Sequence, residues 1–175
     1  MKKNPSFYLS FVTLLISVSS LQSETLWKNL NDNNGVYSKI DDKNPFSGEV
    51  SGTASGKLIY GKKTGAWKFF DDDGNLRYIE NYLEGVEHGF FKSFYTNGHV
   101  FSSGYFSNGL EDEVWTFYHP NGQVREKIVY AKGKENGLWQ FYYENGNLMS
   151  EGTYILGLEE GIFRTFYSNG KLSSL

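Results

Sequence analysis

The chain has 175 residues, with 17 Lys and Arg against 20 Asp and Glu and a formal net charge of −3. Aromatic residues make up 18% of it, and it contains 20 glycines, 3 prolines and no cysteine. The absence of cysteine excludes disulfides, thiol chemistry and cysteine-based zinc sites. The aromatic content argues against a disordered chain, and the net acidity argues against binding to nucleic acid. The composition therefore indicates a glycine- and aromatic-rich β protein with the length of one domain.

Residues 1–23 have the pattern of a secretory signal peptide. Lys2 and Lys3 precede an apolar stretch over 7–18, and small residues, among them Ser20 and Ser23, follow it. The apolar stretch is shorter than the roughly 20 residues of a membrane-spanning helix. We predict cleavage after Ser20 or Ser23 rather than an uncleaved anchor. The protein is then expected to be exported, in a periplasm or outside the cell, and not to bind membranes after cleavage.

The segment that follows, 24–45, is polar and predicts a linker or a loosely docked arm. Trp27 is the exception, and we expect it to pack on the nearest face of the folded domain. Residues 46–66 form a degenerate first repeat of the pattern described next. Its glycines Gly56, Gly61 and Gly65 match Gly152, Gly157 and Gly161 of a later repeat.

Aromatic residues recur every 24 residues from position 67 onward, and such self-similarity indicates a repeat architecture. Each unit starts with an aromatic residue, has a glycine seven residues later and a second aromatic residue fifteen residues later, and we assign all three positions structural roles. The first aromatic residues are Trp67, Phe91, Trp115, Trp139 and Phe163; the glycines are Gly74, Gly98, Gly122, Gly146 and Gly170; the second aromatic residues are Tyr82, Phe106, Tyr130 and Tyr154.

Each unit predicts a β-hairpin, because an Asn-Gly or Asp-Gly pair such as Asn145-Gly146 favours a two-residue type I′ turn. With that turn, Trp139 lies opposite Gly152 on the partner strand. A ring across bare glycine backbone shields the ladder hydrogen bonds there, which gives both residue types a packing reason.

Three positions depart from this arrangement. Glu80 and Ile128 replace the glycine opposite Trp67 and Trp115, and Glu113 replaces the glycine opposite Tyr130. We expect these units to pack less well than the others.

The predicted fold is all-β: tandem 24-residue hairpins that form an elongated, twisted, open antiparallel meander sheet. One hairpin cannot bury its own apolar face, so neighbouring hairpins must stack side by side. The expected units span 67–90, 91–114, 115–138, 139–162 and a truncated 163–175.

The pattern from Gly137 and Trp139 through Asn145-Gly146 to Tyr154 resembles the bacterial variant of the MORN repeat. It is also similar to the repeats of YwqK-type antitoxin-like proteins. The resemblance covers 46–175, loosely before Gly65. It implies tandem hairpins that act as scaffolds or binding modules and have no catalytic residues. The predicted export signal does not fit an antitoxin that meets its toxin in the cytoplasm.

No pattern in the sequence predicts catalysis, a cofactor or a metal site, and we expect a protein that is not an enzyme. His88, His99 and His119 are not spaced as a metal or triad set. The acidic turn 71–73 lacks the alternating ligands of a calcium loop. The acidic runs 111–113 and 159–160 are expected to be solvated loops between hairpins.

The functional hypothesis concerns rings that are not needed for the core. Rings at the other strand parity or beside the turns have more freedom to bind a partner, and repeated aromatic platforms can stack on sugars. The candidate binding rings are Phe70, Phe94, Tyr95, Tyr118, Tyr142, Tyr143, Phe166 and Tyr167.

We expect a protein-binding or scaffolding module of the cell envelope. The alternatives are a glycan- or peptidoglycan-binding module and an antitoxin-like partner of a toxic protein. The last strand edge predicts strand addition or a homodimer.

Overall fold

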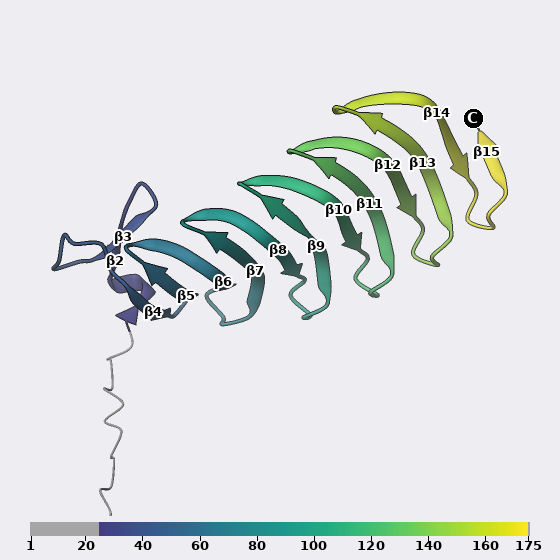
Figure 1. Cartoon of the computed structure of the whole chain (residues 1–175). Helices are drawn as coiled ribbons and strands as arrows, with labels where there is room; N and C mark the ends of the chain where they lie inside the picture. The colour runs from purple at the N-terminus through teal and green to yellow at the C-terminus, as the bar shows by residue number, and fades with distance from the viewer. Residues whose placement is uncertain (1–24, 175) are drawn as a thin grey trace, which may run out of the picture.

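The computed structural model describes residues 25–174, so the predicted signal peptide lies outside the described residues. Thirteen strands form one open sheet in which each strand pairs with the next along the chain, with β1 as the exception. The hairpins follow one another in a row, and the two ends of the described chain lie at opposite ends of the ribbon (Figure 1). The fold is all-β with tandem hairpin repeats, as predicted.

Strands β6 to β14 are eight or nine residues long, and the outer strands are shorter. The sheet consists of β1 (Thr25–Leu26), β4 (Gly48–Ser51), β5 (Ala54–Ile59), β6 (Lys62–Phe70), β7 (Leu76–Leu83), β8 (Val86–Phe94), β9 (Val100–Ser107), β10 (Leu110–Tyr118), β11 (Val124–Ala131), β12 (Lys134–Tyr142), β13 (Leu148–Ile155), β14 (Leu158–Phe166) and β15 (Leu172–Ser174). Strands β2 (Leu30–Asn33) and β3 (Val36–Lys39) form a separate hairpin, and a single 3₁₀ turn covers Trp27–Asn29.

The turns at the Asn-Gly pairs differ from the prediction. Tyr143 N–H donates to the Asn147 carbonyl and Gly146 N–H to the Tyr143 carbonyl, which closes a three-residue loop. Of its residues only Gly146 has a positive φ, 84°, so the loop is a type I turn followed by a left-handed glycine. Two-residue type I′ turns occur at the opposite end of the hairpins, for example at Leu156-Gly157, where both φ values are positive.

The predicted register is correct over most of each hairpin. Trp139 pairs with Gly152, and Gly137 pairs with Tyr154. The pairing shifts after Phe141, because Phe141 pairs with Ser150 and Tyr142 with Leu148, which leaves Met149 as an extra residue on the second strand. The sheet is mixed rather than purely antiparallel, since β1 pairs with β4 in the parallel sense.

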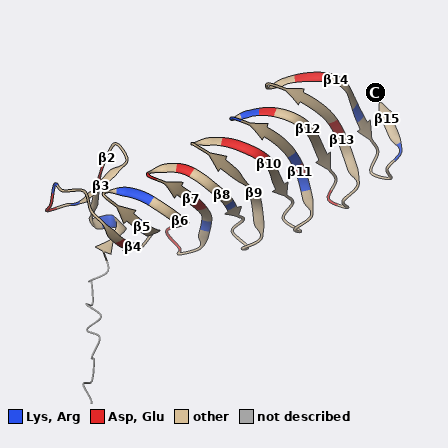
Figure 2. Ribbon diagram, in the orientation of Figure 1, with Lys and Arg blue, Asp and Glu red and all other residues tan. Residues whose placement is uncertain are grey.

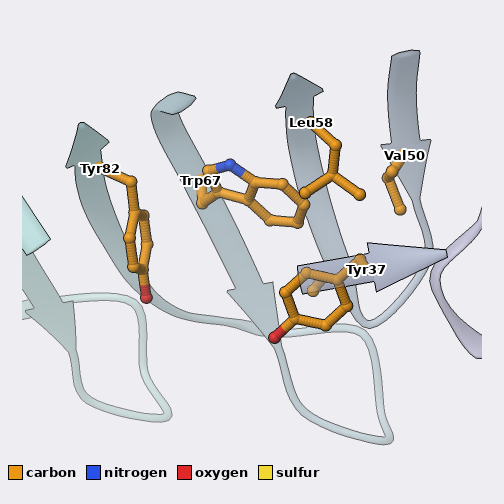
Figure 3. Close-up of a cluster of buried hydrophobic side chains, with 6 residues drawn as sticks. Tyr37, Val50, Leu58, Trp67 and Tyr82 are labelled. Carbon is orange, nitrogen blue, oxygen red and sulfur yellow. The ribbon is translucent and has the colours of Figure 1, made fainter. Parts of the chain in front are cut away.

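Residues 25–45 form a folded end to the sheet and differ from the expected linker or loosely docked arm. Trp27 packs on Trp67, as expected, with ring centroids 5.5 Å apart. Tyr37, from the β2–β3 hairpin, is buried in the same cluster as Val50, Leu58, Trp67 and Tyr82 (Figure 3). This segment is polar in composition, yet its two aromatic side chains, Trp27 and Tyr37, cover Trp67, the first ring of the repeat.

The rings cover glycines, but on the strand that precedes them. A Cβ atom placed on Gly152 would lie 2.1 Å from the Phe163 ring, and one on Gly104 would lie 2.2 Å from the Trp115 ring. Gly56 is covered by Trp67 in the same way. The shielding therefore acts between successive hairpins rather than within one hairpin.

This direction reverses the packing prediction for the units of Trp67 and Trp115. Trp67 and Trp115 lie opposite Glu80 and Ile128, yet they are 0% and 6% exposed. They are buried because the strand before each ring offers a bare glycine. Trp139 is only partly buried, because the residue on its preceding strand is Ile128.

A bulge occurs between every pair of neighbouring hairpins. The residue opposite the bulge is a glycine at some of these junctions and a residue with a side chain at the others. Three residues lie opposite one wherever a hairpin meets the next: 113–115 lie opposite Gly104, and 136–138 lie opposite Val129. Gly137 is required there, since a Cβ on it would lie 2.9 Å from the Val129 Cβ. Glu113 instead has open surroundings and a φ of 60°, the left-handed value that Gly65 and Gly161 adopt in equivalent units.

Candidate binding face

One face of the sheet, here called the ring face, carries the first and second aromatic residues of every repeat. Ring contacts connect Trp27 through Trp67, Phe69, Tyr78 and Phe91 to Trp115 and Tyr130, with centroid separations of 4.4–6.3 Å. A second group joins Trp139 to Phe141, Tyr154 and Phe163. Alternation along each strand places these residues on one side.

The ring face is only partly covered within the described chain. Trp67 and Trp115 are buried, but Phe91, Trp139, Tyr154 and Phe163 retain partial exposure. The β2–β3 hairpin packs on the start of the sheet around Trp67, and within the described residues no second sheet packs on strands β8 to β15. The face therefore offers a row of aromatic surface that a partner could bury.

Glutamates form a row along the edge of the ring face at the type I′ turns. Glu87, Glu111, Glu135 and Glu159 recur every 24 residues, each paired in register with the second aromatic residue of its unit; for example, Glu159 pairs with Tyr154. Figure 2 shows acidic residues on β8, β10, β12 and β14 near these turns. We call these four residues the acidic row.

The first repeat has a lysine at the position of the acidic row. The ammonium of Lys63 lies over five rings, at 4.6 Å from the Tyr82 centroid and 4.8 Å from that of Phe69; the other three rings are Trp27, Tyr37 and Trp67. Lys63 Nζ also lies 3.4 Å from the Tyr82 hydroxyl. The site is an aromatic cage that holds a cation of the same chain.

Burial and neighbouring charges around this cage shift the pKa values of several side chains. Burial lowers the pKa of Lys63, and the carboxylates of Glu80 and Glu87 act against that shift. Burial also raises the pKa of Glu80, although the Tyr82 hydroxyl donates a hydrogen bond to its carboxylate. Burial and Asp32 together raise the pKa of Tyr37 to about 12.

The equivalent position in the fourth unit has three of the five rings, and it has carboxylates without a cation of the chain. Trp139, Phe141 and Tyr154 correspond to Trp67, Phe69 and Tyr82, and Glu135 takes the place of Lys63. Trp139 Nε1 donates to Glu126 at 2.8 Å, and the Tyr154 hydroxyl lies 3.4 Å from Glu159. Burial raises the pKa of Tyr154, and the charges of Glu159 and Glu135 add to the shift.

The predicted binding residues divide into two groups in the structure. Tyr95 and Tyr143 lie beside the turns, where each hydroxyl donates to a main-chain carbonyl of the next hairpin, at 2.7 Å for Tyr118 and 2.9 Å for Phe166. His119 makes the equivalent contact with the Tyr142 carbonyl at 2.9 Å. These side chains tie successive hairpins together, whereas Tyr167 at the equivalent place is 57% exposed.

The other predicted rings lie at the turn end of the strands and at the opposite parity to the ring face. All five are partly exposed, and the Tyr142 hydroxyl donates to Gln140 at 2.8 Å. They are Phe70, Phe94, Tyr118, Tyr142 and Phe166. The structure therefore keeps them apart from the ring face and leaves each with some free surface.

Two further predictions concern polar residues. The runs 111–113 and 159–160 lie inside β10 and β14, so the prediction that they are loops is wrong.

In the acidic turn 71–73, the Asp71 carboxylate caps its own turn by accepting hydrogen bonds from the N–H groups of Asn75 and Asp73, and these bonds lower its pKa. Within residues 25–174, no cluster of three or more His, Asp or Glu side chains is arranged to hold a metal ion.

Sequence reasoning missed the acidic row and Lys63. The signal that could have found them is their spacing, since Lys63 is in phase with the four glutamates at intervals of 24 residues. The prediction that 111–113 and 159–160 are loops concealed the position of Glu111 and Glu159 on the ring face.

A family model described as MORN repeat variant matches four segments, residues 63–84, 114–132, 135–155 and 159–175. The strand pairs in these four segments are repeats of this type, and the β8–β9 pair lies outside the matched residues. The segments coincide with the strand pairs around the type I turns. Each contains a glycine that closes the loop, for example Gly74 and Gly146.

Comparison with curated proteins finds no significant match. Among solved structures, the chain is similar to one described as the crystal structure of TarM, with 11% sequence identity and a TM-score of 0.38. The match covers 65% of this chain and 20% of TarM, so the chain spans a fifth of the length of that relative. Within residues 25–174, no helix is long and apolar enough to cross a membrane.

Proposed function

We propose that the chain is an exported, non-enzymatic repeat module of the cell envelope that binds another protein on its ring face. The observation that supports this most is the row of partly exposed rings on a single-layer sheet. Large apolar surfaces with a polar rim are typical of protein interfaces. Export rests on the pattern of residues 1–23, and the MORN-type repeats fit a binding module rather than an enzyme.

The binding face can be tested with a pair of neighbouring positions. Phe141 lies on the ring face and Tyr142 on the other face, and both are partly exposed. A photocrosslinking amino acid at position 141 is expected to capture a protein from envelope fractions, and one at position 142 is not. Equal capture from both positions, or none from either, would contradict the proposal.

Export is tested separately by fractionation and N-terminal sequencing of the full chain. We expect the recovered protein to begin at Leu21 or Glu24, after cleavage behind Ser20 or Ser23. Recovery of an intact N-terminus in the cytoplasmic fraction would remove the envelope part of the proposal and leave the binding face untouched.

A second candidate is a glycan-binding module, favoured by the free surface of the rings on the opposite face. Tyr142 is partly exposed, and its hydroxyl has a side-chain partner that fixes the ring as a platform. Saturable binding to purified peptidoglycan that is lost in Tyr142→Ala, with the far-UV circular dichroism spectrum retained, would support this function. Absence of binding by the wild-type chain would exclude it.

A further inference from the structure

The fourth repeat and its flanks combine aromatic surface with an excess of negative charge, of which only Glu151 is paired, with Arg164 at 3.4 Å. Residues 135–163 contain five glutamates and neither lysine nor arginine. The glutamates are Glu135, Glu144, Glu151, Glu159 and Glu160. Glu135 and Glu159 lie on the ring face, where they flank Trp139 and Tyr154.

The first repeat shows which chemical group this arrangement holds. There the position of Glu135 is taken by Lys63, whose ammonium lies within 6 Å of five ring centroids. A second cation of the chain, Arg125, lies 5.4 Å and 5.7 Å from the rings of Phe101 and Phe117 on the same face. At the position equivalent to Arg125, the next repeat has Met149.

From this comparison we infer that the ring face of the fourth repeat binds the basic side chains of a partner protein. This inference rests on the proposed function and specifies the partner as a segment rich in lysine or arginine. An ammonium among Trp139, Phe141 and Tyr154 gains cation–π attraction, and Glu135 and Glu159 supply the opposite charge. Its environment would share three rings and nearby carboxylates with that of Lys63, which also has Glu80 and Glu87 nearby, but it would lack the rings of Trp27 and Tyr37.

The repeat also sets the spacing of the cations. Neighbouring strands lie about 4.8 Å apart, so equivalent positions in successive hairpins are separated by about 10 Å. A segment in the polyproline II conformation that runs along the ribbon advances about 9 Å in three residues and places every third side chain on the same side. A basic residue at every third position would therefore meet one member of the acidic row in each hairpin.

The test measures binding of a fluorescent peptide with lysine at every third position, with serine and threonine between, by fluorescence anisotropy. The control peptide has every lysine acetylated. We expect the wild-type chain to bind the first peptide and not the second, and raised salt to weaken binding. Failure of the wild-type chain to prefer the charged peptide would overturn the inference.

Two double variants locate the interaction. Glu135→Gln with Glu159→Gln removes two charges from the ring face and is expected to weaken peptide binding about tenfold. Glu144→Gln with Glu160→Gln removes the same charge from the turn and from the opposite face, and is expected to change binding less than about twofold. Equal losses in the two variants would show attraction to net charge alone and contradict the inference.

A charge-reversing variant imitates the first repeat. Glu135→Lys places an ammonium of the chain itself beside Trp139, Phe141 and Tyr154, and we expect it to abolish peptide binding. Peptide binding retained at the wild-type affinity by a folded Glu135→Lys variant would overturn the inference. If photocrosslinking from position 141 still captures a protein while none of these variants matters, the proposed function stands and this inference fails.

Discussion

Trp115 and Trp139 occupy the same position in successive repeats, yet they pack differently. Trp115 lies on bare backbone at Gly104 and is 6% exposed, and its Nε1 donates to the Tyr105 carbonyl at 3.2 Å. Trp139 follows a strand with Ile128 at that place, remains partly exposed and donates to the Glu126 carboxylate.

The residue on the preceding strand therefore controls how closely each ring approaches the backbone, and within the sheet this determines how far the ring is buried. A glycine lets the ring approach the backbone, whereas a side chain holds the ring away from it. Trp67 on Gly56 follows the first arrangement. Phe163 also lies against bare backbone at Gly152, but it stays partly exposed at the end of the sheet, where only the short β15 follows. Phe91, after Glu80, follows the second. The glycine-backed rings gain close backbone contact, and the rings held outward keep the free aromatic surface to which the proposed function assigns a partner.

The largest expected effect separates the two tryptophans directly. Trp115→Ala removes a fully buried ring and should lower the free energy of unfolding by about 4 kcal/mol. Trp139→Ala removes a partly exposed ring and should cost about half as much. Urea denaturation followed by far-UV circular dichroism measures both. Equal losses would contradict the assignment of different roles.

Adding a methyl group beneath a buried ring should have the next largest effect. In Gly104→Ala the new Cβ would lie 2.2 Å from the Trp115 ring, and the required shift should cost about 2–3 kcal/mol. Gly98→Ala is the control, because its surroundings are open and only its φ of 83° is unfavourable. We expect the control to lose about 1 kcal/mol in the same denaturation experiment. A smaller loss at Gly104 than at Gly98 would be inconsistent with ring-on-backbone packing.

Replacement of Glu113 by glycine is expected to stabilise the unit of Trp115, whose ring lies on a glycine. Its φ of 60° strains a residue with a side chain, and Gly65 and Gly161 occupy the equivalent positions without that strain. Glu113→Gly should therefore raise the free energy of unfolding by about 1 kcal/mol, and Gly161→Glu should lower it by a similar amount. A destabilised Glu113→Gly protein would show that the carboxylate has a structural role.

The hydroxyl contacts between hairpins should each contribute about 1 kcal/mol or less. Tyr143→Phe removes the hydrogen bond to the Phe166 carbonyl while it retains the ring. We expect hydrogen exchange to quicken in the last hairpin, with little change in the first. Uniform quickening along the chain would indicate a global effect instead.

The smallest effect is a pH dependence at Glu80, the residue on the strand before Phe91. Its pKa is raised by burial, so the folded chain holds this proton more tightly than the unfolded chain. The stabilisation from this tighter proton binding is fully present below the ordinary pKa of a glutamate. It is lost as the pH rises through the raised pKa of Glu80 in the folded chain. Glu80→Gln should remove this decline from the curve of unfolding free energy against pH. A variant that keeps the full decline would assign it to another group.

The 24-residue period, the hairpins and most of the register could be predicted from the sequence. Rings and glycines at fixed spacing identify the strands, and Trp139 pairs with Gly152 as expected. The type of turn could not be predicted, since Asn145-Gly146 is compatible with a type I′ turn and with a type I turn followed by a left-handed glycine. Hydrogen bonds of Tyr143 and Asn147 select the second.

The candidate site was harder to predict, because its residues depend on contacts between hairpins. The sequence shows which residues pair within a unit, but Gly152 is covered by a ring from the next unit. The cage around Lys63 includes Trp27 and Tyr37, which come from a segment whose polar composition resembles a linker. Long-range packing of this kind leaves no periodic signal in the sequence.

The most direct measurement of the central claim is acrylamide quenching of single-tryptophan variants in which the other tryptophans are replaced by phenylalanine. Trp115 should be quenched weakly and Trp139 strongly, and Ile128→Gly should bring the quenching of Trp139 close to that of Trp115. If Trp139 is quenched no more than Trp115, or if Ile128→Gly leaves it unchanged, the residue on the preceding strand does not control burial of the ring.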